Sequence, residues 1–357
     1  MKIKSLVLFN YRNHLKLNMK LDDNINVIYG SNGMGKTNII ESIYFVSYLN
    51  SYRANKFNEV INFDSNFAKI HLTSDSIYEV IISNNKKKCL LNNRVIPKQS
   101  DFIGVFKSVL FSPETIDILL KSPSQRRKYI DIFICMIDNT YIHVIKEFHY
   151  ILKQRNEYLR QMMINSLTDK KYFDILNERY VKTSLIIYRK RKLVIKELND
   201  YAKNIFKEFF DFDLSIKYEV QSKINFDDLE SSFINKLEIK FEQELYKGNT
   251  LVGPSYDDII FNINNRNVKF FGSKGQQRVV LISLKLAEIM VISKFTNTAP
   301  ILILDDVLSE LDEKRQNILF DFLSSKDLQT IITTTDYNDI KNNICFNKIS
   351  LDNINDN

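Results

Sequence analysis

Three of the chain's eight glycines lie within six residues, in the segment GSNGMGKT that runs from Gly30 to Thr37. This segment matches the phosphate-loop pattern G-x-x-x-x-G-K-[ST]. It follows the apolar run INVIY and precedes residues 36–49, which contain no Gly or Pro and predict a helix. A loop that wraps a triphosphate turns its backbone N–H groups inward, and side chains at the three glycines would obstruct that approach. A glycine turn without a ligand is the alternative, but the flanking strand and helix favour the phosphate loop.

The same segment predicts which groups would hold the nucleotide and its metal. The helix that follows adds the partial positive charge of its N-terminus. Lys36 brings an ammonium group to the β- and γ-phosphates, and the hydroxyl of Thr37 is a ligand for Mg²⁺. We therefore predict an ATP site formed by the whole loop: Gly30, Ser31, Asn32, Gly33, Met34, Gly35, Lys36 and Thr37.

Two adjacent carboxylates follow a short apolar run later in the chain. Residues 301–304, ILIL, predict a buried strand that delivers Asp305 and Asp306 at its carboxyl end, where open α/β sheets bind their ligands. We assign Asp305 to Mg²⁺, through a water molecule, and Asp306 to the attacking water as general base. Taken alone, two acidic residues after a strand also suit the start of a helix, so this assignment depends on the phosphate loop.

A third segment, GSKGQQR at residues 272–278, holds two more glycines and precedes an apolar stretch that predicts a deeply buried helix. A Ser/Gly turn at the N-terminus of a helix is a second candidate anion site. Its residues Ser273, Gly275 and Gln276 belong to a separate element from the phosphate loop.

The order of patterns along the chain predicts an α/β protein with a helical insertion. The first third is rich in strands, with a hairpin turn at Asn92 and Asn93, and residues 115–212 contain one Pro, no Gly and two long apolar stripes at helical spacing. The last part predicts a hairpin over IIFNINNRNVKFF, a helix from about 275, a strand at 301–304, a helix at 312–324 and a final strand at 328–334. The predicted domains are 1–114, 115–250 and 251–357.

Basic residues are concentrated in the predicted helical domain. The net charge of the chain is +7, and residues 115–217 alone hold 20 Lys and Arg against 13 Asp and Glu. Such an excess indicates a polyanionic partner, although solvated helix faces would give the same pattern. The candidate DNA contacts are Arg126, Arg127, Arg189, Lys190 and Arg191.

Cysteine usage indicates a reducing compartment, and the hydropathy pattern predicts no membrane span. The three cysteines are far apart in the sequence, which favours free thiols. The N-terminal residues do not resemble a signal peptide, and no apolar run reaches the ~20 residues that a membrane span needs. We expect a cytoplasmic protein with no membrane contact.

The three phosphate-related segments, in this order, resemble the ABC-type ATPase head, a P-loop NTPase fold. The chain is further identified as similar to the RecF family of recombination mediators, on the segments FNYRNH, GKTNIIESIY, VLFSPETIDILLKSPSQRRKYID, LKQRNEYL, TLVGPSYDD, SKGQQR and LDDVLSELDEKR. That resemblance implies a head with an inserted helical domain, ATP-dependent homodimerisation and weak DNA-stimulated ATP hydrolysis. It also implies sequence-independent binding of single-stranded and duplex DNA near gaps, with RecR and RecO as partners in loading RecA.

The resemblance further implies roles for particular residues. Ser273, Gly275 and Gln276 would act in trans on the γ-phosphate bound by a second copy, the loop SELD (309–312) would cross the dimer interface, and Arg12 would touch the nucleotide. The chain departs from the family at Ser255 and Tyr256, where relatives usually carry His-Arg. The TTTD loop at 333–336 has Thr where many ABC heads have a His that senses the γ-phosphate.

Three alternatives were considered. A transporter ATPase is disfavoured because it would place its Ser/Gly loop closer to the phosphate loop. An SMC protein is disfavoured because it would need a coiled-coil arm of hundreds of residues. A nucleotide-gated scaffold that binds ATP with negligible turnover is compatible with Asp306, which is shorter than the Glu common at this position in ABC heads.

Overall fold

The structure is a computed structural model that describes residues 1–83, 86–112, 118–164, 169–308, 311–337, 340 and 345–352. The chain forms two compact units. Unit 1 comprises Met1–Asp117, Tyr201–Phe212 and Lys274–Asn357, and unit 2 comprises Ile118–Asp200 and Asp213–Ser273. Among the described residues, no helix combines the length and the apolar character required to cross a bilayer.

A five-stranded parallel sheet forms the centre of unit 1. Its strand order is β14-β3-β13-β12-β8, and every neighbouring pair runs in the same direction. The strands are β3 (Ile25–Tyr29), β8 (Ser108–Phe111), β12 (Ile301–Asp305), β13 (Thr330–Thr334) and β14 (Asn347–Ser350). Because β3 and β12 are both followed by ligand-binding segments and flank β13, the parallel order brings their carboxyl ends to one edge of the sheet.

A second sheet in unit 1 is antiparallel and has the order β2-β1-β4-β5-β6-β7. Its strands are β1 (Ser5–Tyr11), β2 (His14–Lys20), β4 (Phe67–Thr73), β5 (Ile77–Ser83), β6 (Lys86–Leu91) and β7 (Arg94–Ile96). The β6–β7 turn occurs at Asn92 and Asn93, both with positive φ, which confirms the predicted hairpin.

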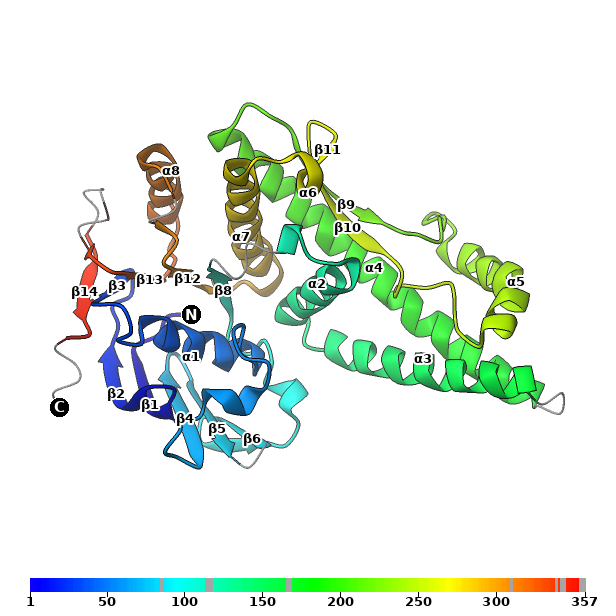
Figure 1. Cartoon of the computed structure of the whole chain (residues 1–357), viewed down its shortest axis with the longest axis horizontal. Helices are drawn as coiled ribbons and strands as arrows, with labels where there is room; N and C mark the ends of the chain where they lie inside the picture. Colours follow the sequence, from blue (N-terminus) through cyan, green and yellow to red (C-terminus); the bar gives the residue numbers. More distant parts are fainter. Residues whose placement is uncertain are drawn as a thin grey trace. The chain divides into compact units, whose positions relative to one another are not determined.

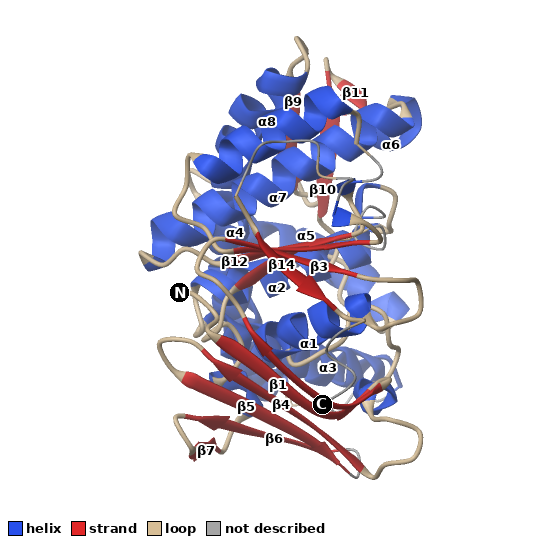
Figure 2. Cartoon of the chain, turned by 90° about the vertical axis from the view of Figure 1, so that its left-hand side faces the viewer, coloured by secondary structure: helices blue, strands red, loops and turns tan. Residues whose placement is uncertain are grey.

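Three helices complete the layers of unit 1. Figure 2 shows α1 (Lys36–Tyr48) between the two sheets, and α7 (Lys274–Thr296) and α8 (Glu313–Ser324) on the opposite face of the parallel sheet. Helix α7 is buried on nearly all sides from Val279 to Ile292, as its continuous apolar sequence predicts. One apolar cluster joins α1 to both sheets, so the helix that starts at the phosphate loop is held firmly.

Unit 2 is mainly helical, as predicted for the insertion (Figure 1). Its helices are α2 (Pro123–Ile137), α3 (Tyr141–Ile164), most of α4 (Lys170–Phe209), α5 (Leu229–Lys247) and the short α6 (Val268–Phe271). A three-stranded antiparallel sheet accompanies them, in the order β11-β10-β9: β9 (Leu214–Glu219), β10 (Asp258–Ile263) and β11 (Arg266–Asn267).

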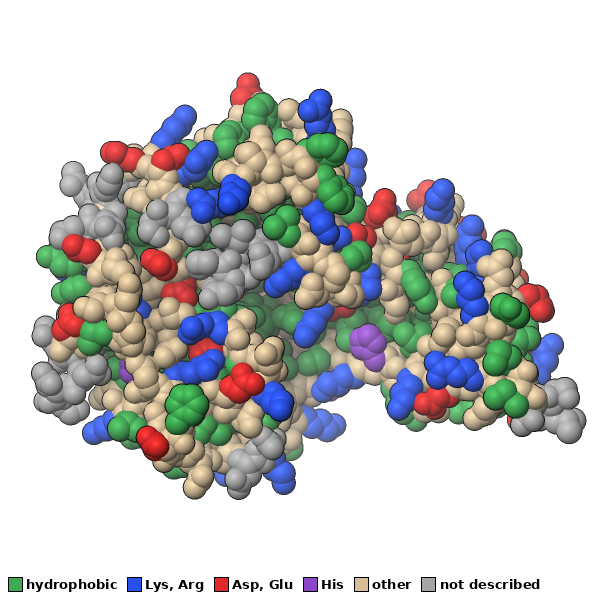
Figure 3. Space-filling view, in the orientation of Figure 1, with side chains coloured by type: hydrophobic (Ala, Val, Ile, Leu, Met, Phe, Trp, Pro, Cys, Tyr) green, Lys and Arg blue, Asp and Glu red, His purple; other side chains and the backbone are tan. Residues whose placement is uncertain are grey.

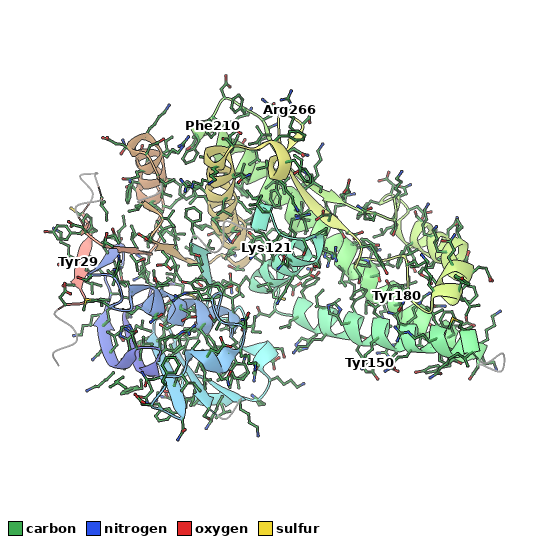
Figure 4. All side chains as sticks on the ribbon, viewed as in Figure 1. Tyr29, Lys121, Tyr150, Tyr180, Phe210 and Arg266 are labelled. Atoms are coloured by element: carbon green, nitrogen blue, oxygen red, sulfur yellow. The ribbon has the colours of Figure 1, made fainter. Side chains whose placement is uncertain are left out.

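The core of unit 2 contains a buried ion pair among aromatic rings. Tyr180 of α4 stacks on Phe148 of α3, and its hydroxyl donates to the carbonyl oxygen of Val252 at 2.8 Å (Figure 4). The guanidinium of Arg155, which is 1 % exposed, contacts the fully buried Glu244 at 2.6 Å. Since Arg155 lies on α3 and Glu244 on α5, this pair joins two helices to the ring cluster.

The structure differs from the predicted elements in four places. Residues 268–271, expected as the second strand of a hairpin, form helix α6, because the Asn267 side chain accepts from the Lys269 N–H and starts a helical turn. Strand β9 was not predicted, and β14 follows the strand expected to be the last. Residues 251–273 group with unit 2 rather than with the head, because β10 pairs with β9 over six residues. The predicted boundary at 114 lies outside the described residues.

Candidate nucleotide-binding site

The predicted phosphate loop connects β3 to α1, in the place that the pattern requires. Gly33 has φ of 88° and Gly35 has φ of 95°, a left-handed region that side chains rarely tolerate. A Cβ on Gly35 would lie 2.5 Å from Asn13 Oδ1 and 2.5 Å from His14 Nε2, whereas a Cβ on Gly33 would meet no atom within 4 Å. The loop is therefore tightly packed at Gly35 and open at Gly33.

Lys36 begins α1 and bends back over the loop. Its ammonium donates to the carbonyl oxygens of Gly30 at 2.5 Å and Ser31 at 3.1 Å. Burial lowers the pKa of Lys36 below its ordinary value, and the nearby carboxylates of Asp306 and Asp305 oppose that shift. A phosphate group beside Lys36 would replace the two carbonyl contacts with a stronger, charge-assisted one.

Thr37, in the first turn of α1, lies beside Asp305, the last residue of β12. The hydroxyl of Thr37 donates to Asp305 Oδ1 at 3.2 Å, and the hydroxyl of Thr333 donates to the same oxygen at 2.7 Å. Tyr52 donates to Asp305 Oδ2 at 3.0 Å. The structure thus brings together the two residues that the sequence assigned to the metal, and it orients the 3 % exposed Asp305 with two further hydroxyl groups.

Asp306 follows at the end of β12 with φ of 51°. Its backbone N–H donates to Thr333 Oγ1 at 3.1 Å, which ties the residue to the neighbouring strand β13. A cavity of about 220 Å³ opens here, and its lining includes Asp306, Asp305, Lys36 and Thr37. A left-handed backbone in a non-glycine residue at a cavity is typical of functional sites.

Sequence reasoning did not identify several residues of this cavity. They are Asn38, Arg53, Thr333 and Thr335, together with Tyr52, which contacts Asp305. Arg53 donates to Asn38 Oδ1 at 3.0 Å, so the segment after α1 reaches back to its first turn. Thr333 and Thr335 belong to the TTTD loop, whose position after β13 was the available signal.

Arg12 does not line the cavity. Its guanidinium donates to both carboxylate oxygens of Glu41, at 2.8 and 2.7 Å, and to the Glu59 carbonyl oxygen at 2.9 Å. Glu41 lies on α1 and is fully buried, and its hydrogen bond raises the pKa of Arg12. The geometry favours a role for Arg12 in supporting α1, and its predicted contact with the nucleotide stays a prediction.

The second predicted anion site lies at the start of α7. Ser273 is exposed and directly precedes the helix, and Gly275 lies near α8, since a Cβ there would be 3.8 Å from Arg315 Nη2. Gly275 and Gln276 belong to unit 1, yet neither is among the described residues that line its cavity. The first two residues of the SELD loop, Ser309 and Glu310, lie outside the described residues.

The described residues suit a magnesium nucleotide. The loop offers backbone N–H groups and one ammonium, and the strand end offers a hydroxyl and a carboxylate, which are the oxygen ligands that Mg²⁺ prefers. The open side of Gly33 leaves room beside the loop. Among the described residues, no cluster of three or more His, Cys, Asp or Glu side chains could bind a metal without further ligands. Phosphate oxygens and waters would therefore supply the rest of the shell.

The structure corrects two of the five candidate DNA contacts. Arg126 and Arg191 are buried, and each forms a bidentate ion pair, with Asp258 and Asp131 respectively. Arg127 is partly exposed and donates to the Asp257 carbonyl oxygen at 2.5 Å, so its contact with DNA stays a prediction.

Arg189 is exposed, and Lys190 is partly exposed and pairs with Asp138 at 2.7 Å. On the face drawn in Figure 3, Lys and Arg side chains are scattered among acidic and hydrophobic ones. The visible basic residues therefore form no continuous stripe on that face.

Comparisons with known proteins identify relatives of the chain. The family model described as "RecF/RecN/SMC N terminal domain" matches residues 2–353. A DNA replication and repair protein RecF from Clostridium kluyveri is 37% identical over 354 residues, covering 96% of this chain and 95% of that protein.

Solved structures extend the comparison to the fold. A structure of the recombination mediator protein RecF-ATP in the RecFOR pathway has a TM-score of 0.87 and 27% identity, and it covers 98% of this chain and 95% of that one. An SMC head bound to the C-winged helix domain of ScpA, with a TM-score of 0.55, 14% identity and coverage of 96% and 91%, shares the fold alone. The expected α/β architecture of an ABC-type ATPase head is thus confirmed, and the chain belongs to the RecF family of DNA replication and repair proteins.

Proposed function

We propose that the chain is an ATP-dependent DNA-binding protein of recombinational repair and replication restart, and a weak, DNA-stimulated ATPase. The observation that carries the proposal is the meeting of Thr37 and Asp305 at 3.2 Å beside the phosphate loop. These residues come from different strand–loop segments, 268 positions apart, and the Thr333 hydroxyl donates to the same buried carboxylate oxygen. The RecF-ATP structure, 27% identical, supports the same ligand.

In this mechanism the loop residues Gly30 to Thr37 hold the triphosphate. Lys36 would leave its carbonyl partners to contact the β- and γ-phosphates, while Thr37 would hold Mg²⁺ directly and Asp305 would hold it through a water molecule. The metal supplies charge neutralisation at the phosphate oxygens. Asp306, held at the cavity by its N–H bond to Thr333, orients the attacking water and accepts its proton.

The site is completed by a second copy of the chain. Ser273, Gly275 and Gln276 cap the γ-phosphate bound to the other copy, so ATP joins two copies into a dimer. The dimer grips the DNA phosphate backbone through electrostatic, sequence-independent contacts near gaps, and hydrolysis opens it. By family membership, RecR and RecO are the protein partners that help load the recombinase, in the cytoplasm.

Mixing two inactive variants tests the composite site. Lys36→Ala removes the phosphate contact, and Ser273→Arg blocks the capping loop. Each protein alone should stay monomeric with ATP, because both of its sites are damaged. A mixture should recover ATP-dependent dimers and hydrolysis, since a mixed dimer keeps one intact site. Sedimentation velocity and phosphate release measure both properties.

Two outcomes would contradict parts of the proposal. A mixture that recovers neither dimer nor hydrolysis removes the trans assignment. Dimers that form with ATP and bind DNA but release no phosphate, with or without duplex DNA, would identify a nucleotide-gated scaffold instead of an ATPase.

A further inference from the structure

Unit 2 contains a pocket of about 510 Å³ that the nucleotide site does not use. It lies between the N-terminus of α2, helix α5, the turn after β9 and the loop before β10. None of the residues that line it belongs to the cavity beside the phosphate loop. Every lining residue comes from unit 2, so the pocket is complete within one compact unit.

Three lysines from two segments line the pocket: Lys223, Lys236 and Lys240. Lys236 and Lys240 are one turn apart on α5 and therefore share a face of that helix. Lys223 comes from the turn after β9, where its φ of 48° is left-handed. All three lysines line one hollow, and their positive charge favours an anion there, while Lys240 also donates to Gln243 Oε1 at 3.0 Å.

The pocket has little negative charge to offset these lysines. Among the described residues that line it, Asp258 is the one carboxylate. Both oxygens of Asp258 already accept hydrogen bonds from Arg126, at 2.8 and 2.6 Å, which balances that charge inside the protein. Helix α2 begins at Pro123, which lines the pocket, and adds the positive end of its dipole.

The remaining wall combines the polar side chains of Gln221 and Ser222 with an apolar part that suits the uncharged part of a ligand. Tyr256 is 42% exposed, and its hydroxyl donates to the Thr250 carbonyl oxygen, so its ring rather than its polar atom is available. Leu251 and the ring of Pro123 lie in the same lining. Lysines beside an aromatic ring are a combination that recognises phosphate groups attached to a base or sugar.

We propose that this pocket binds clustered phosphate groups, either of a nucleic acid backbone or of a free polyphosphate. The nucleic-acid form rests on the proposed DNA-binding function, whereas the polyphosphate form does not. The site is separate from the phosphate loop, so its ligand adds to the nucleotide rather than replacing it.

The test compares three triple variants of the full chain. Lys223→Gln, Lys236→Gln and Lys240→Gln together remove the pocket charge. The matched control changes three exposed lysines of unit 2 outside the pocket, Lys153, Lys196 and Lys247, to Gln and so removes equal charge. A third variant changes the pocket lysines to Arg and keeps their charge. Circular dichroism verifies folding, and Lys240→Gln alone replaces the first triple should it unfold.

Two binding arms distinguish the sources of phosphate. The first measures fluorescence anisotropy of labelled single-stranded and duplex oligonucleotides without ATP. The pocket triple should weaken binding about tenfold or more, and should reduce the slope of log affinity against log salt by about 2 for single strands, from three contacts of ~0.7 each. The second arm measures inorganic tripolyphosphate by calorimetry in a Lys36→Ala background, where the phosphate loop no longer contributes.

The two arms together identify the ligand. If the pocket triple weakens oligonucleotide binding alone, the pocket binds nucleic acid. If it weakens tripolyphosphate binding, the pocket binds free polyphosphate. Equal effects of the pocket triple and the control triple in both arms, or no effect of either, overturn the proposal. Because the pocket variants of the first arm keep Lys36, Asp305 and Ser273, ATP-dependent dimerisation should persist in them. That result separates a failure of this inference from a failure of the proposed function.

Discussion

The packing around the phosphate loop predicts different costs for two chemically identical substitutions. Gly33→Ala and Gly35→Ala both place a side chain at a left-handed φ, of 88° and 95°. That strain costs about 1–2 kcal/mol, partly offset by about 0.4–1 kcal/mol from a less flexible unfolded chain. Gly33→Ala has no further cost, because its Cβ meets open space. We expect a net loss of about 1 kcal/mol.

Gly35→Ala should cost more, because the new Cβ displaces Asn13 and His14, each 2.5 Å away. The displaced side chains lose the Asn38–Asn13 hydrogen bond at 2.8 Å and the contact of His14 Nε2 with the Gly35 carbonyl oxygen at 3.1 Å. At about 0.5–1.5 kcal/mol each, the total reaches about 2–4 kcal/mol. In a unit of roughly 200 residues this lowers the melting temperature by about 4–16 °C, against about 2–4 °C for Gly33→Ala.

Thermal unfolding without nucleotide measures the two variants. The chain has no Trp, so circular dichroism is the probe, and hydrogen exchange of peptides from α1 assigns the change to unit 1. Equal losses for the two variants would show that Asn13 and His14 do not support the loop. The described packing at Gly35 would then be refuted.

Further predictions concern the metal ligands and the two buried ion networks. Thr37→Val and Asp305→Asn should each weaken the dependence of nucleotide affinity on Mg²⁺, measured by calorimetry with and without chelator, because the first removes a hydroxyl ligand and the second removes the negative charge that holds the metal's water. Arg155→Met should destabilise the chain by about 3–5 kcal/mol in urea, since Glu244 stays buried without its partner, and adding Glu244→Gln should recover part of that loss. Burial raises the pKa of Asp257 to about 6, so the folded chain binds more protons than the unfolded chain between pH 4 and 6. Its stability should therefore fall by about 3 kcal/mol as pH rises through that window, and Asp257→Asn should remove this slope.

The nucleotide site was largely predictable because its residues follow local patterns. Glycine spacing, a strand before it and a helix after it place Lys36 and Thr37 without any knowledge of distant contacts. The run ILIL likewise delivers Asp305 to the carboxyl edge of the sheet. Tyr52 escaped prediction and Thr333 was noted only as part of the TTTD loop, because their hydrogen bonds to Asp305 join residues 253 and 28 positions apart.

The basic residues of unit 2 show where such reasoning fails. The basic excess of the helical insertion made Arg126 and Arg191 candidate DNA contacts, yet both are buried. Their partners Asp258 and Asp131 lie 132 and 60 positions away, so the sequence shows unbalanced charge where the fold balances it. Pairing between distant strands likewise places residues 251–273 in unit 2, because β10 is hydrogen-bonded to β9. Local composition predicted the helical insertion, and non-local pairing decided its limits.

The buried state of α7 supports the proposal that the capping loop acts on a second copy. Nine Val, Leu and Ile side chains of this helix are buried. Moving the helix so that its first residues reached the cavity of their own chain would expose several of them, at about 1.5–3 kcal/mol each, which quickly exceeds 10 kcal/mol at this rate. Association of two copies costs about 4–15 kcal/mol in lost freedom but leaves α7 in place. A bound triphosphate that contacts both copies can offset the cost of association. That cost arises once per dimer, whereas each dimer holds two sites. Rigid packing of α7 thus favours closure between copies over closure within one.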